Sequence, residues 1–140
     1  MLKFGIGQSV RRVEDRRFLT GHGRYTDDIV LDGQLYASFV RSPYASARIN
    51  AVDVADARAA DGVVAVFTGA DLDADGIGGV PSVARVKNAD GTPMQAPKRP
   101  AIASEAVHFA GEAVAMVIAT DPVLARDAAE LVAVDYEERP

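Results

Sequence analysis

The chain has 140 residues, a formal net charge of −5 and no cysteine. That length is typical of one domain, and such a domain buries roughly two-thirds of the surface of its unfolded chain. The negative charge argues against a nucleic-acid or anionic-membrane partner. The lack of cysteine excludes a disulfide framework, a cysteine-based zinc site and an iron–sulfur cluster within these residues. No apolar run approaches the roughly 20 residues that a membrane span needs, so we expect a cytoplasmic protein.

Residues 1–34 show no sustained hydrophobic period, and we expect an extended N-terminal segment that is ordered by contact with further protein. Four arginines and two acids fall within residues 11–17. The arginines could bind a phosphate-bearing ligand, but Glu14 and Asp15 lie among them, which favours local neutralisation and salt bridges. No apolar stretch follows the first arginine pair, so the pair does not form a twin-arginine export signal.

Three strands and one turn of helix are expected before the middle of the chain. Residues 35–41 alternate between two faces and end before Pro43, which cannot donate to a ladder. A second strand is expected at 48–54, a short alanine-rich turn of helix at 56–60, and a buried, β-branched strand at 63–68.

Residues 73–101 are rich in glycine and proline and show no period, which predicts a long loop that is either functional or mobile. Asp71 to Gly76 match the first half of a calcium-binding loop. Ser82 stands where the bidentate glutamate of such a loop belongs, so the pattern favours a solvated acidic turn over a calcium site.

No other pattern indicates a catalytic, cofactor-binding or metal site. His22 lies between two glycines, as an exposed loop residue does, and His108 is typical of a strand residue with a polar tip. The two histidines are far apart in sequence and imply no third metal ligand. The chain also has no phosphate-binding loop, no dinucleotide fingerprint and no nucleophile elbow.

The C-terminal third predicts a strand, a helix and a strand. Residues 113–120 are apolar on both faces, as in a central strand. Asp121 is a natural N-cap and Pro122 suits the first helical position. Leu124 and Leu131 then belong to an apolar helical stripe. The stripe also includes Ala128 and Val132.

An alternating strand at 132–137 completes this set. Strand, helix and strand in this order predict a βαβ unit with a right-handed crossover, and hence a mixed sheet. The predicted fold class is therefore α+β.

Three blocks of sequence resemble one family. They are RVEDRRFLTGHGRYTDDI at 12–29, FVRSPYA at 39–45, and GEAVA at 111–115 followed by ARDAAELVAVDYE at 125–137. Together they resemble the N-terminal domain of the molybdenum-binding large subunit of the xanthine dehydrogenase, aldehyde oxidoreductase and carbon monoxide dehydrogenase family. The resemblance covers nearly the whole chain and weakens only across 73–101.

The resemblance implies an α/β-hammerhead fold and a domain without chemistry of its own. In that family the longer C-terminal part of the subunit holds molybdopterin, and iron–sulfur clusters and flavin (FAD) sit in partner domains or subunits. The complete enzyme would oxidise a small aldehyde, an aromatic heterocycle or carbon monoxide with a water-derived oxygen. The chain alone would be inactive, and no catalytic or cofactor residue carries over onto it.

Two readings of the function stay open from the sequence. In the first, the chain is one domain of a large subunit, and contacts with neighbouring domains are expected at charged and turn residues of the three blocks. These are Arg12, Glu14, Asp15, Arg41, Ser42, Pro43 and Glu112. In the second, the chain is a free-standing hammerhead module for binding or interaction, with no redox role.

Overall fold

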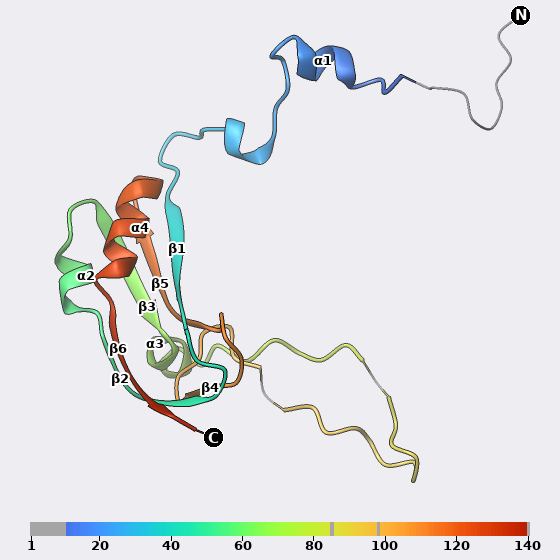
Figure 1. The fold of residues 1–140 in the computed structure, drawn as a ribbon, viewed down its shortest axis with the longest axis vertical. Coiled ribbons are helices and arrows are strands. Elements are labelled where there is room, and N and C mark those ends of the chain that lie inside the picture. Colours follow the sequence, from blue (N-terminus) through green and yellow to red (C-terminus); the bar gives the residue numbers. More distant parts are fainter. Residues whose placement is uncertain (1–10, 85, 98, 140) are drawn as a thin grey trace, which may run out of the picture. The chain divides into compact units, whose positions relative to one another are not determined.

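The computed structural model describes residues 11–84, 86–97 and 99–139, and the expectations for residues 1–10, 85, 98 and 140 lie outside them. The chain divides into two compact units, with the boundary between Gln34 and Leu35. Figure 1 shows the helices and strands of both units.

The first unit contains helix α1 (Asp15–Leu19) and a 3-10 turn, η1 (Thr26–Asp28). Two interactions order it. The rings of Phe18 and Tyr25 stack with their centroids 5.4 Å apart, and the Asp28 carboxylate accepts the Tyr25 N–H at 2.8 Å. The expectation of an extended segment is therefore wrong for α1 and η1, because aromatic stacking and local capping do not appear as hydrophobic periodicity.

The second unit is built from two three-stranded antiparallel sheets (Figure 1). In the first sheet, β5 (Ala113–Ala119) lies between β1 (Tyr36–Arg41) and β3 (Val63–Thr68). In the second sheet, β2 (Ala47–Asp53) lies between two further strands. These are β4 (Ala106–Val107) and β6 (Ala133–Glu138).

Helix α4 (Pro122–Glu130) connects the two sheets. It begins as predicted, since the Asp121 carboxylate accepts the N–H of Val123 at 2.7 Å. The predicted βαβ unit and mixed sheet are wrong, however. The strands before and after α4 belong to different sheets, and every pairing in both sheets is antiparallel. Periodicity locates a strand but does not say which partner it pairs with.

The hydrophobic core lies between the first sheet on one side and the second sheet with α4 and α2 (Ala55–Ala59) on the other. One cluster joins Val114 of β5 to Ala47 and Ile49 of β2. A second cluster joins Val117 of β5 to Ala128 of α4. Small alanines at this contact let α4 approach the sheet closely.

Leu131 does not belong to this core. It follows the last residue of α4 as the C-cap and is 47% exposed, whereas Ala125 and Ala128 are the buried residues of the helix. The apolar stripe predicted from the sequence is therefore correct at Ala128 and wrong at Leu131, because the helix ends one residue before it.

The acidic segment predicted to be a solvated turn begins with a helix, α3 (Gly69–Ala74). Thr68 caps it: the Thr68 hydroxyl accepts the Asp71 N–H at 3.4 Å and donates to the Asp71 carboxylate at 2.7 Å. Gly69 is needed for space, since a Cβ there would stand 2.6 Å from the carbonyl oxygen of Ala103.

Residues 75–105 form a long excursion between α3 and β4, which we call the arm (Figure 1). Backbone hydrogen bonds join its two sides, from Val80 N–H to Arg99 C=O at 2.7 Å and from Met94 N–H to Val86 C=O at 3.2 Å. Apart from an isolated bridge between Lys87 and Pro93, the arm has no helix or strand among its described residues.

Candidate functional site

Two turns pack against each other where β1 ends and β5 begins. Four of the predicted contact residues lie there: Arg41, Ser42, Pro43 and Glu112. The Ser42 N–H donates to the Glu112 carbonyl at 2.8 Å, and the Gly111 N–H donates to the Ser42 carbonyl at 2.8 Å. The Arg41 guanidinium donates to the Gly111 carbonyl at 2.9 Å. The turn pair is thus held by backbone and side-chain bonds between segments about 70 residues apart in sequence.

Ser42 is buried within the first turn and bonds to its backbone. It is only 3% exposed, and its hydroxyl accepts the Tyr44 N–H at 3.0 Å. Tyr44 in turn packs on Tyr136, with ring centroids 5.1 Å apart, and burial raises the pKa of Tyr136. The Ser42 side chain is therefore a structural part of this domain, while Arg41 and Pro43 remain exposed beside it.

Glu112 closes the second turn. Its carboxylate accepts the backbone N–H of His108 at 2.6 Å and lies 3.6 Å from Nδ1 of the same residue. The Glu112 side chain is 12% exposed and that of His108 is 73% exposed. His108 directly follows β4, so the expectation of a strand residue with a polar tip is wrong by one position.

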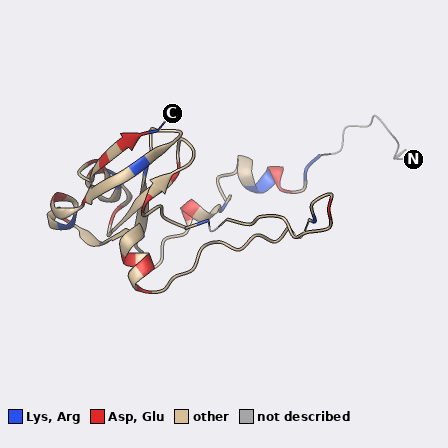
Figure 2. Ribbon diagram, turned by 90° about the horizontal axis from the view of Figure 1, so that it is seen from below, with Lys and Arg blue, Asp and Glu red and all other residues tan. Residues whose placement is uncertain are grey.

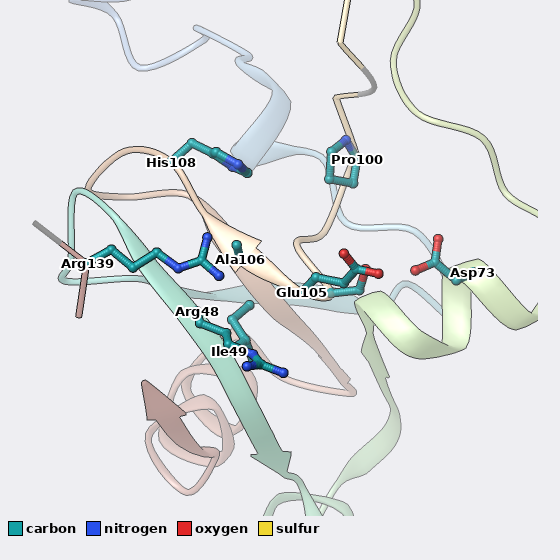
Figure 3. A pocket seen from close by; sticks show the side chains of 9 residues that line it. Arg48, Ile49, Asp73, Pro100, Glu105, Ala106, His108 and Arg139 are labelled. Atoms are coloured by element: carbon teal, nitrogen blue, oxygen red, sulfur yellow. The ribbon is translucent and has the colours of Figure 1, made fainter. Parts of the chain in front are cut away.

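The hollow in Figure 3 lies beside β2 and β4 and has a volume of about 810 Å³. Its lining mixes charges of both signs. Arg48 of β2 and Arg139 face it together with Asp73 of α3 and Glu105 (Figure 3). All four are exposed residues, which is typical of a solvated depression with balanced charge.

Arg12, Glu14 and Asp15 lie in the first unit, at or just before the start of α1. Arg12 and Glu14 are exposed, and the Asp15 N–H donates to the Arg12 carbonyl at 3.3 Å. Arg17, the last of the arginines, lies over the ring of Phe18 at 5.1 Å. In the described residues 11–34, none of these arginines forms an ion pair with Glu14 or Asp15, contrary to the expected salt bridges.

Within the described residues, no group of three or more His, Asp or Glu side chains is arranged so that it could hold a metal ion. None of their helices is long and apolar enough to cross a membrane.

A family model described as "Aldehyde oxidase and xanthine dehydrogenase, a/b hammerhead domain" matches residues 20–140. The chain belongs to this family. The resemblance and the hammerhead fold predicted from the three sequence blocks are thereby confirmed.

Relatives of this hammerhead domain are parts of larger oxidoreductases. The carbon monoxide dehydrogenase large chain of Afipia carboxidovorans is 43% identical over 136 residues, which is 97% of this chain and 16% of that protein. The nicotine 6-hydroxylase large subunit of Paenarthrobacter nicotinovorans is 40% identical over 132 residues, 94% of this chain and 15% of that protein. The chain therefore spans about a sixth of the length of these relatives.

A solved structure shows the same arrangement. The quinoline 2-oxidoreductase from Pseudomonas putida 86 superposes with a TM-score of 0.82 at 43% identity, over 96% of this chain and 16% of that chain. The two small sheets with few helices seen here are thus the form of the hammerhead domain.

The family implies molybdopterin, and the residues of this chain do not fit it. Molybdopterin carries an anionic phosphate and anionic sulfur ligands. In the hollow of Figure 3 the carboxylates of Asp73 and Glu105 offset the guanidinium groups of Arg48 and Arg139, so the lining offers no net positive charge. The four charged side chains at the hollow, Arg48, Asp73, Glu105 and Arg139, are all exposed, so they offer no preorganised cradle. No catalytic step is therefore derived through this group.

Proposed function

We propose that the chain is the non-catalytic hammerhead domain of a molybdenum hydroxylase large subunit. The complete enzyme would oxidise a small aldehyde, an aromatic heterocycle or carbon monoxide with a water-derived oxygen. The observation that carries the proposal is the 43% identity with a carbon monoxide dehydrogenase large chain over 97% of this chain and 16% of that protein.

In this proposal the chemistry lies outside the 140 residues. Molybdopterin would be held by the rest of the large subunit, with iron–sulfur clusters and FAD in partner domains or subunits. Support comes from the large-subunit relatives, of whose length this chain spans only about a sixth. The cytoplasmic location expected from the sequence remains part of the proposal.

Molybdenum analysis and activity measurements test this proposal. The complete natural polypeptide that contains these residues should hold molybdenum and should reduce a dye acceptor with an aldehyde, an N-heteroaromatic compound or carbon monoxide. The 140-residue chain alone should hold no molybdenum and no flavin. Stoichiometric molybdenum in the short chain, or none in the complete polypeptide, would contradict the proposal.

We further propose that exposed residues beside the turn pair contact neighbouring domains, with Arg41 as the principal one. Among the described residues, one guanidinium nitrogen of Arg41 donates a hydrogen bond, to the Gly111 carbonyl, whereas a guanidinium has five donor N–H groups. Arg41→Ala should lower the yield of molybdenum-loaded polypeptide, whereas Arg126→Ala, at an exposed position of α4, should not. Equal yields would refute the contact. The other predicted contacts, Arg12, Glu14 and Asp15 of the first unit and Ser42, Pro43 and Glu112 of the turn pair, are likewise proposed to contact neighbouring domains.

A further inference from the structure

The two sheets of the second unit have chemically different outer faces. In the β4–β2–β6 sheet, the positions that point away from the core are exposed and largely charged, and Figure 2 shows both signs of charge on these strands. Arg48 of β2 stands opposite Glu137 of β6, for example. The polar residues at these positions are Arg48, Asn50, Asp53, Asp135 and Glu137, and the exposed alanines Ala51 and Ala133 lie among them. This is the pattern of a sheet face that water covers.

The outer face of the β1–β5–β3 sheet is apolar instead. Two rows of side chains cross its three strands in register, and we call them the apolar face. One row is Ala37, Ile118 and Ala65, and the other is Phe39, Met116 and Phe67. Neither row contains a polar side chain. This face therefore lacks the charged side chains that cover the outer face of the other sheet.

The apolar face is not part of the core. The opposite face of the same sheet carries the buried Val66, Val117 and Ala119, and α4 packs there (Figure 1). All six residues of the apolar face stay half-buried or exposed, and Phe39 is 43% exposed. Single exposed apolar residues are ordinary, but two complete rows across three strands are a contiguous patch, which marks an interaction surface.

We propose that the rest of the large subunit packs on the apolar face, and this inference rests on the proposed function. The relatives of this chain are about six times its length, so their domains of this type are covalently joined to several hundred residues of further protein. A covalently joined partner has a high effective concentration and therefore covers such a face before a separate molecule does.

The composition of the apolar face indicates the kind of surface that covers it. Two phenylalanines and a methionine form one of its two rows, and such residues are enriched in the desolvated middle of interfaces. The Arg41 guanidinium lies over the Phe39 ring at 5.7 Å, so a polar rim begins at the turn pair. The partner surface should therefore be apolar at its centre, with acceptor groups where it reaches Arg41.

Hydroxyl-radical footprinting tests the proposal, because radicals oxidise methionine and phenylalanine side chains that water reaches. The 140-residue chain at low concentration is compared with the complete natural polypeptide. Oxidation of Met116, Phe39 and Phe67 should be slower by about tenfold or more in the complete polypeptide, because interface centres pack as densely as protein interiors. Val123 of α4, 55% exposed, should keep its rate.

Other results of the footprint would overturn the inference. Equal rates in both forms would show that the rest of the subunit does not cover the face. Protection in the short chain that rises with concentration would mean that a second copy covers it. Protection in the short chain at every concentration would mean that a segment of the chain itself does.

A pair of variants separates a docking surface from a mere folding defect. Phe39→Glu places a charge on the apolar face, and Val123→Glu places one at an exposed position of α4. Both should leave the urea midpoint of the short chain close to that of the parent. In the complete polypeptide, only Phe39→Glu should restore rapid oxidation of Met116, and equal protection in both variants would refute the proposal.

The inference and the proposed function fail in different ways. The molybdenum content of the complete polypeptide tests the function, and the footprint of the apolar face tests the docking surface. A molybdenum-loaded polypeptide with a freely oxidised Met116 would refute only the docking surface. A protected face without molybdenum would refute only the function.

Discussion

Replacing Thr68 with valine removes one hydroxyl from the cap of α3 and should lower the free energy of unfolding by about 1–2 kcal/mol. The hydroxyl accepts the Asp71 N–H at 3.4 Å and donates to the Asp71 carboxylate at 2.7 Å. Loss of an N-cap costs about 1 kcal/mol, and a hydrogen bond to a charged group adds to that. Water replaces part of the second bond because the Asp71 side chain is 39% exposed. Valine nearly conserves the volume at this 9%-exposed position, so no large cavity contributes.

The same substitution should weaken the dependence of stability on acid. The Thr68 hydroxyl is the largest cause of the lowered pKa of Asp71, followed by the Thr68 backbone N–H, with a smaller contribution from the Arg58 guanidinium. A carboxylate whose pKa is lowered by folding stabilises the fold above its unfolded pKa, about 3.9, and this stabilisation is lost as the pH falls through the folded pKa. Without the hydroxyl, the two pKa values lie closer together.

Urea unfolding followed by circular dichroism, at several pH values from about 6 down to about 2.5, measures both effects across the titration range of Asp71. Asp71→Asn is the matched control, since it removes the titrating charge and should flatten the same part of the curve. The double variant should lose less stability than the sum of the single variants, because both act on one hydrogen bond. An unchanged stability in Thr68→Val, or the full acid dependence of the parent, would refute the cap as the cause.

Three further predictions follow from packing and from the form of α3. Gly69→Ala should destabilise by about 1–3 kcal/mol, because its Cβ would stand 2.6 Å from a carbonyl oxygen, whereas Gly78→Ala, with nothing within 4 Å, should be tolerated in the same urea assay. Leu131→Ala, at a 47%-exposed residue, should lower the free energy of unfolding by less than about 1 kcal/mol. Val117→Ala, at a fully buried residue, should lower it by about 2 kcal/mol. Equal losses in the two variants would contradict the assigned core. Calorimetry should detect no calcium binding to residues 71–82, where a helix replaces the expected loop geometry, and micromolar affinity would contradict this.

The sequence predicts those elements whose signals are local. Asp121 and Pro122 mark the start of α4 because capping depends on neighbouring residues. The β-branched run of β3 likewise marks its strand. Helix α3 was missed although its capping box, Thr68 to Asp71, stands in the sequence, because the alternating acids match half of a calcium loop more conspicuously.

The arrangement of the strands depends on contacts that no local pattern contains. Alternation in β1 separates Phe39 from Val40, but both faces of this strand contain apolar residues, so the pattern does not indicate which one is buried. The structure buries the Val40 face and leaves Phe39 outside. The pairing of Arg41 and Ser42 with Gly111 and Glu112 spans about 70 residues and is equally hidden from periodicity.

The arm divides the second unit into two halves that interleave. Before it come β1, β2 and β3, and after it come β4, β5 and β6. The later half supplies the central strand of one sheet, and the earlier half supplies the central strand of the other. Neither half can therefore complete a sheet alone, and folding must wait for pairings between residues distant in sequence, which slows it. Because each sheet contains strands from both halves, two fragments produced by a cut in the arm would remain joined by strand pairing in both sheets. A break or insertion at the exposed Asp90 and Gly91 of the arm should therefore be tolerated without the two halves coming apart.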